Sequence, residues 1–229
     1  MRKLIPVFAS VLLLGSGCAS APGGRITAWD QLPRNAAQPN GFGLYSYLLF
    51  AHEPVTPTEQ ARYLAAVREI LAATPAADQL LATGVRSSRI NLALIPVTTG
   101  RDLDGLSLDD RAREILEQYD YARAAAILSM FNEPLTRGPY IISARSPIDA
   151  DTVGVGQHLM QDLTYTTPSN VGRWINAFVT QARHRNYRRA DSVGRLMLEL
   201  RNGLSVVSEI APAVVTGVES LVKWVAPKP

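Results

Sequence analysis

The chain has 229 residues, 47% of them hydrophobic, and a formal net charge of +3 from 23 basic and 20 acidic residues. A domain this close to neutral lacks the concentrated positive field that replaces phosphate counterions, so we predict no nucleic-acid partner. The length allows one substantial apolar core, and a single globular domain is expected.

The N-terminal residues follow the order of an export signal. Arg2 and Lys3 precede an uncharged, largely apolar run from Leu4 to Leu14, and three small residues then come directly before Cys18. The run has about eleven residues, whereas a helix that spans a bilayer needs about twenty. A signal peptide over residues 1–17 is therefore favoured over a permanent membrane span. Its removal would leave 21 basic residues against 20 acidic ones.

Cys18 is the only cysteine in the sequence and follows Leu14-Gly15-Ser16-Gly17. This stretch resembles the lipobox of bacterial lipoproteins, with Gly15 where that motif usually carries leucine. The resemblance implies lipidation at Cys18, cleavage just before it, and a membrane partner reached through the lipid anchor. An ordinary signal peptide cut nearby is the alternative, but it would leave an unpaired thiol in an oxidising compartment.

The resemblance also predicts where the protein is found. It implies the cell envelope, and Ala19 after the cysteine, rather than aspartate, implies the periplasmic face of the outer membrane of a Gram-negative bacterium. Lipidation of the only cysteine would leave none for a disulfide, so the fold must depend on its apolar core.

Residues 18–41 are expected to be the lipidated cysteine and a flexible linker, because proline, glycine and asparagine recur there with little periodicity. Trp29 is the one large aromatic residue in this stretch. Its ring can rest in the membrane interface or dock on the surface of the protein itself. Residues 42–229 are expected to form one globular domain with a helical C-terminal third.

Strand and helix patterns alternate through the first part of this domain. Strands are predicted over 44–51, over 90–95 with Pro96 as its limit, over 139–143 and, more weakly, over 157–163. Helices are predicted after the N-cap Thr56, after Pro75 as far as Ala82, after Ser107 with a face that continues to Phe131, and over 171–182. The pattern favours an α/β fold, with α+β as the alternative: a small mixed sheet of three to four strands packed by helices.

The C-terminal region carries a long apolar seam. From Val193 to Val225 apolar residues alternate gaps of four and three, which is typical of a coiled coil, although Gly203 and Pro212 interrupt the pattern. The long helical region can pack on its own domain. Alternatively, residues 193–225 contact an envelope protein or form a homo-oligomer.

The sequence contains few recognisable catalytic patterns. The three histidines lack the short spacing of a zinc motif, and there is no Gly-x-Ser-x-Gly elbow, phosphate loop or dinucleotide fingerprint. We therefore predict no metal and no cofactor, and favour a non-catalytic binding or interaction module. The alternative is an envelope or cell-wall hydrolase with a site near the third and fourth strands, and its catalytic candidates are His158, Asp162, Ser143 and Arg145.

A third alternative is a small-ligand or metal carrier. Thr98, Thr99, Arg101 and Asp102 follow the second predicted strand, and we expect them at the same sheet edge as Ser143 and Arg145 from the end of the third strand. Asp102 with Asp104, and Asp149 with Asp151, form two Asp-x-Asp pairs. Neither pair fits the order of an EF-hand loop, and turn or helix-cap roles explain them more simply.

Arginines gather near the end of the helix predicted over 171–182. Arg183, Arg185, Arg188 and Arg189 can contact anionic lipid headgroups or a polyanionic cell-wall polymer. A solvated structural role at the negative end of the helix dipole is the alternative.

Overall fold

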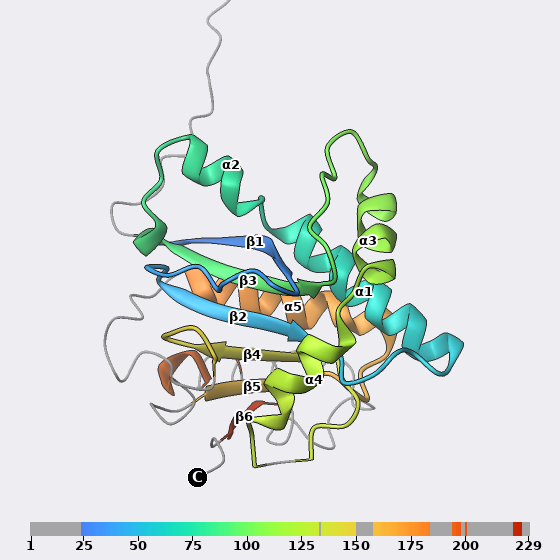
Figure 1. The fold of residues 1–229 in the computed structure, drawn as a ribbon. Helices are drawn as coiled ribbons and strands as arrows, with labels where there is room; N and C mark the ends of the chain where they lie inside the picture. Colours follow the sequence, from blue (N-terminus) through green and yellow to red (C-terminus); the bar gives the residue numbers. More distant parts are fainter. Residues whose placement is uncertain are drawn as a thin grey trace, which may run out of the picture.

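The protein has an α/β fold built on one six-stranded mixed sheet with strand order β1-β3-β2-β4-β5-β6. The computed structural model describes residues 24–132, 134–149, 158–183, 194–197, 200 and 222–225. Helices α1 (Pro57–Ala73) and α5 (Pro168–Arg183) pack together behind the sheet, and α4 (Tyr121–Ser129) lies on the opposite face (Figure 1). The predicted α/β class is confirmed, and the sheet is larger than the three to four strands expected.

The strands divide the sheet into a parallel and an antiparallel half. β1 and β2 both pair with β3 in parallel, whereas β4 is antiparallel to β2, β5 to β4 and β6 to β5. The strands are β1 (Ile26–Pro33), β2 (Leu44–Leu49), β3 (Ile90–Val97), β4 (Tyr140–Ala144), β5 (His158–Asp162) and β6 (Val222–Val225). The four predicted strands correspond to β2, β3, β4 and β5.

Strand β1 lies within the stretch that we expected to be a flexible linker. All eight of its residues pair with β3, from Ile26 opposite Ile90 to Pro33 opposite Val97. Ala28 and Leu32 are buried, so the strand contributes to the core as well as to the sheet. The linker prediction is therefore wrong from residue 26 to residue 33, because parallel pairing and burial order a segment whose composition resembles a loop.

Two helices, α1 and α3 (Leu108–Glu117), begin at the caps that the sequence predicts. Thr56 Oγ1 accepts a hydrogen bond from the Glu59 amide at 3.2 Å, and Ser107 Oγ accepts one from the Asp110 amide at 3.2 Å. Each cap satisfies an amide that has no partner within its own helix. The helices are α1 (Pro57–Ala73), α2 (Ala77–Ala82), the 3-10 turn η1 (Ser87–Arg89), α3 (Leu108–Glu117), α4 (Tyr121–Ser129) and α5 (Pro168–Arg183).

The helix expected to continue from Ser107 to Phe131 is two helices. The first helix ends at Glu117, and Asp120 caps the second, because its side chain accepts a hydrogen bond from the Arg123 amide at 3.0 Å. Its own amide donates to Pro96 O at 3.1 Å, at the point where β3 is no longer paired with β2. β3 itself runs past Pro96, where we expected it to stop, because its pairing with β1 continues to Val97 opposite Pro33.

The two faces of the sheet are covered differently. On the face beneath α5, Asn91 Nδ2 donates to Ala182 O at 2.5 Å and so connects β3 to the helix. On the opposite face, the hydroxyl of Tyr47 donates to Gln38 and accepts from the Ile148 amide at 2.9 Å. Connecting segments therefore supply much of the cover on the second face.

The C-terminal seam lies mostly outside the described residues. Residues 194–197 are helical, but residues 222–225 form β6 beside β5, so the helical prediction is wrong there. Among the described helices, none combines the length and the apolar character needed to cross a membrane.

Candidate functional site

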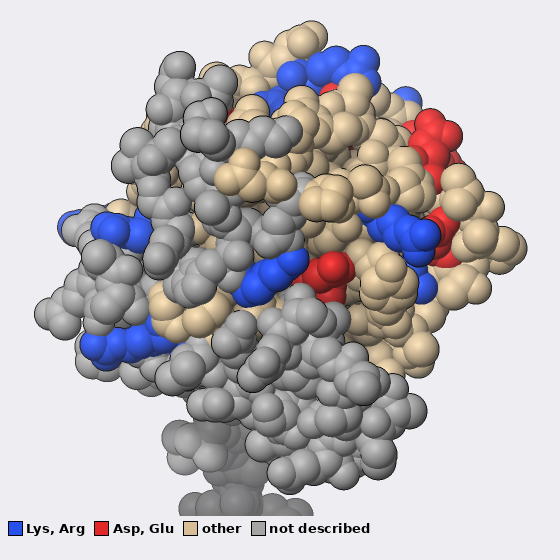
Figure 2. Space-filling model, turned by 90° about the horizontal axis from the view of Figure 1, so that it is seen from below, with Lys and Arg blue, Asp and Glu red and all other residues tan. Residues whose placement is uncertain are grey.

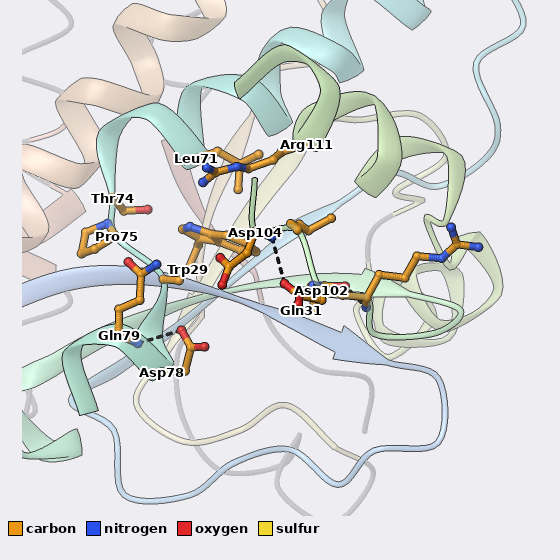
Figure 3. Close-up of a pocket in the computed structure, with 13 residues that line it drawn as sticks. Trp29, Gln31, Leu71, Thr74, Pro75, Asp78, Gln79, Asp102, Asp104 and Arg111 are labelled. Carbon is orange, nitrogen blue, oxygen red and sulfur yellow. Dashed lines mark hydrogen bonds between the residues drawn. The ribbon is translucent and has the colours of Figure 1, made fainter. Parts of the chain in front are cut away.

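A pocket of about 430 Å³ lies beside β1, between the end of α1, helix α2 and the loop that follows β3. Figure 3 shows Trp29 in the middle of the view, with Asp78 and Gln79 on one side and Asp102 on the other. The lining residues are Trp29, Gln31, Leu71, Thr74, Pro75, Ala76, Asp78, Gln79, Arg101, Asp102, Leu103, Asp104 and Arg111. The volume falls in the usual range for small-molecule sites.

Trp29 is held in the pocket wall by its own backbone. Its amide donates to Pro75 O at 3.0 Å, and a parallel bridge joins it to Ala76. α1 ends just before this point, where Thr74 bonds back to Ile70 O at 2.7 Å through its hydroxyl. The side chain of Trp29 is 8% exposed, so the indole docks on the protein's own surface, which was one of the two places expected for it.

The side chain of Gln31 joins the loop after β3 to β1 through two hydrogen bonds. Gln31 donates through Nε2 to Arg101 O at 2.6 Å and accepts the Arg101 amide through Oε1 at 3.0 Å. The next residues turn sharply: Asp102 Oδ1 accepts from the Asp104 amide at 2.9 Å, and Gly105 follows with φ of +79°. This turn places Asp102, Leu103 and Asp104 along the pocket.

The charges around the pocket are predominantly negative. Arg101 Nη1 lies 2.6 Å from Glu114 Oε1, so its charge is already compensated. Within the described part of the chain, none of the three lining aspartates, Asp78, Asp102 and Asp104, forms an ion pair. Burial raises the pKa of neighbouring Asp30, and the charge of Asp78 raises it further.

Two of the four residues predicted to form a ligand loop lie in the wall of this pocket. Arg101 and Asp102 line the pocket. Thr98 and Thr99 do not, because both hydroxyls donate to Gln118 Oε1, at 2.9 Å and 3.4 Å.

The expected meeting of this loop with Ser143 and Arg145 is wrong. β2 is parallel to β3, and β4 is antiparallel to β2. The C-terminal end of β4 therefore lies beside the N-terminal ends of β2 and β3, on the side of the sheet away from the loop that follows β3. The chain enters β4 beside the end of β2, where the Ala51 amide donates to Arg137 O at 2.7 Å. A strand that starts at this edge must run back toward the other one.

The four predicted catalytic residues are not brought together. Ser143 is paired directly with Leu159 and so shares a sheet face with it, whereas His158, the neighbour of Leu159 along β5, projects from the opposite face. His158 and Asp162 share a face but stand at the two ends of β5, about 13 Å apart at the usual rise per residue. Arg145 lies beyond the end of β4, at the edge away from Asp162.

The contacts of two of these residues, Ser143 and His158, indicate a structural role. Ser143 Oγ lies 2.9 Å from Ser46 Oγ in a buried hydrogen bond between β4 and β2. His158 is 3% exposed, meets the Phe131 ring edge-on at 5.3 Å between centroids, and has an Nδ1 atom without a hydrogen-bond partner among the described residues. Burial lowers the pKa of His158.

Other predicted site residues fall partly outside the described part of the chain. Cys18, Arg185, Arg188 and Arg189 lie outside it, whereas Arg183 is described and donates to Ala73 O at 3.2 Å. Arg183 therefore connects the end of α5 to the end of α1. Among the described residues, no three histidine, cysteine, aspartate or glutamate side chains converge as metal ligands.

Sequence reasoning missed Trp29, Asp78 and Arg111 as neighbours in one pocket. They come from β1, α2 and α3, and only the parallel pairing of β1 with β3 brings these elements together. The available signal was Trp29 itself, a large aromatic residue in a polar stretch. Comparisons with family models, with curated proteins and with solved structures give no match.

Proposed function

We propose that this protein is a membrane-tethered cell-envelope lipoprotein that works as a non-catalytic binding module. The tether is inferred from Cys18, the only cysteine, which follows a charged, apolar and small-residue segment typical of an export signal. By the lipobox resemblance, the protein is held at the periplasmic face of the outer membrane.

The observation that carries the non-catalytic part is the division of the candidate catalytic residues between the two faces of the sheet. Ser143 is engaged with Ser46 on one face, and His158 is buried against Phe131 on the other. A nucleophile and its base must lie within hydrogen-bond reach, directly or through one water. This arrangement favours binding over the hydrolase alternative.

The pocket beside β1 favours one of the alternatives in particular, a small-ligand carrier. It combines an aromatic wall with polar groups from separate elements, as ligand sites commonly do. A contact with an envelope protein or a second copy through residues 193–225 is a further proposal, and most of that segment lies outside the described residues.

Nucleic acid is not proposed as a partner. The chain is nearly neutral once the signal is set aside. On the face drawn in Figure 2, the coloured basic and acidic side chains of the described residues are interspersed among neutral ones. Nucleic-acid binding depends on a concentrated basic surface.

Lipid labelling tests the tether. The full chain and its Cys18→Ser variant are expressed in a Gram-negative host that is fed an alkyne fatty acid, and the membranes are separated. We expect label and outer-membrane recovery for the wild type, and neither for the variant. An equally labelled variant would refute lipidation at Cys18, and an unlabelled wild type would refute the lipoprotein assignment.

Turnover assays test the non-catalytic part. The wild type and His158→Ala are incubated with purified cell wall and with ester, amide and glycoside reporters. We expect no turnover by the wild type above a preparation that lacks the protein. Hydrolysis by the wild type that is lost in His158→Ala would support the enzyme alternative instead.

A further inference from the structure

The pocket beside β1 contains a hydrogen-bond donor that has no acceptor among the described residues. Trp29 lies in the wall of the pocket and is 92% buried, since only 8% of it is exposed. Its indole nitrogen donates no hydrogen bond within the described part of the chain. The nitrogen itself is not fully buried, so in the pocket wall it remains accessible to an acceptor on a bound molecule.

The carboxylates around this donor are likewise uncompensated. Among the described residues, Asp78 accepts only the Gln79 amide, at 2.7 Å, and Asp102 accepts only the Asp104 amide. The carboxylate of Asp104 has no hydrogen-bond or ion-pair partner among the described residues. Of the two lining arginines, Arg111 forms no ion pair with a described residue, and its Nε donates to Leu106 O at 2.9 Å. The pocket therefore favours a positively charged ligand.

The arrangement suits an organic cation better than a metal ion. The aspartates come from α2 and from the loop after β3, on different sides of the pocket (Figure 3). They do not gather into a set of three metal-ligating side chains within the described residues. A divalent cation needs several oxygen ligands at one point, whereas an amine needs one or two carboxylates and gains from an aromatic wall.

We propose that the pocket binds a small protonated amine that carries a neighbouring oxygen acceptor, the chemistry of an amino sugar or amino alcohol. The ammonium group interacts with Asp78 and Asp104, and the oxygen accepts the indole N–H of Trp29. This inference rests on the proposed binding function and specifies its ligand class. The pocket volume of about 430 Å³ has room for one sugar ring.

The test follows the indole proton itself. The full-length lipidated chain is labelled with nitrogen-15, purified in non-ionic detergent and titrated with glucosamine, N-acetylglucosamine, glucose and ethanolamine while its indole NMR signals are recorded. The Trp29 signal is identified among those of the three tryptophans by its loss in Trp29→Phe. Glucosamine and its N-acetyl derivative share a ring and differ in the charged amine.

We expect glucosamine and ethanolamine to shift the Trp29 signal at concentrations at least about tenfold lower than the two neutral sugars, because charge-assisted hydrogen bonds are about twice as strong as neutral ones. Asp78→Asn and Asp104→Asn should each weaken glucosamine binding by about threefold or more, as for exposed charge pairs. Glu117→Gln removes an exposed carboxylate that does not line this pocket, and it should leave the binding unchanged.

Three outcomes would overturn the inference. The first is that glucosamine and N-acetylglucosamine bind with equal affinity. The second is that glucosamine binds Asp78→Asn and Asp104→Asn as tightly as it binds the wild type. The third is that none of the four molecules shifts the Trp29 signal. Charge-independent binding would refute the amine and leave the binding module standing. The tether is tested separately, by lipid labelling at Cys18.

Discussion

The guanidinium of Arg34 holds the carboxylate of Asp120 through two hydrogen bonds, from Nε to Oδ2 at 2.7 Å and from Nη2 to Oδ1 at 3.0 Å. Asp120 is fully buried, whereas half of the Arg34 side chain is exposed. The same carboxylate caps α4, and the Arg34 guanidinium lowers its pKa. The buried carboxylate of Asp120 therefore connects Arg34, which follows β1, to the start of α4.

Asp120→Asn should lower the free energy of unfolding by about 1–3 kcal/mol, because it weakens a buried charge-assisted pair together with a helix cap. Urea unfolding at pH 7 measures the change. Asp109→Asn is the matched control, since Asp109 pairs with Arg68 at 2.7 Å but is largely exposed, and an exposed pair contributes only about 0–1 kcal/mol. Equal losses in the two variants would contradict the importance of Asp120.

His158 should make the stability of the protein depend on pH. Its pKa is lowered by burial, so below its unfolded pKa of about 6.5 the unfolded chain binds the proton more readily than the folded one. The contribution of neutral His158 is therefore present above that pH and is lost as the pH falls toward the folded pKa. Thermal unfolding of the wild type should shift to lower temperature between about pH 7 and pH 5.

His158→Leu should flatten this pH dependence, because leucine keeps an apolar contact with Phe131 and does not titrate. His52→Gln removes a histidine outside the sheet and controls for the loss of a histidine side chain as such. An unchanged slope in His158→Leu would show that other groups cause the acid sensitivity.

Ser46 and Ser143 should be energetically coupled. Each single alanine variant leaves the other buried hydroxyl without its partner at 2.9 Å, and should lower the free energy of unfolding by about 1–3 kcal/mol. The double variant removes both polar groups and should cost less than the sum of the two. Additive losses in a double-mutant cycle would mean that the hydroxyls do not stabilise each other.

Gly138→Ala should destabilise the protein strongly. Gly138 has φ of +111°, and an added Cβ would lie 2.8 Å from Leu49 O, a backbone atom with little freedom to move. The loss should exceed the roughly 1 kcal/mol that a positive φ alone costs a non-glycine residue. Gly84→Ala isolates that smaller cost, since Gly84 has φ of +83° with nothing within 4 Å of an added Cβ. Similar melting temperatures for the two variants would refute the steric argument.

Local signals in the sequence predicted most of the individual elements. Thr56 and Ser107 are caps because the residues around them already supply the geometry and the amide partner. The division at Asp120 leaves no such signal in the apolar spacing, because Ala122 and Ala126 continue the steps of three and four beyond Tyr119.

The arrangement of the elements could not be predicted in the same way. Strand β1 reads as a loop because Asp30 and Gln31 interrupt its apolar residues, and its order comes from pairing with β3. The reversal of β4 depends on where the chain re-enters the sheet, and no local pattern encodes that point. These two features decide the site, because β1 supplies Trp29 and the reversal separates Ser143 from the loop after β3.

The inclusion of β1 in the sheet also limits how far the protein can stand from a membrane. On a chain lipidated at Cys18, only six residue-to-residue steps separate the anchor from Gly24, the first described residue. At full extension they span at most about 22 Å. The N-terminal end of β1 would then remain near the headgroups, and any molecule bound beside Trp29 would be held within a thin layer of solvent along the membrane surface.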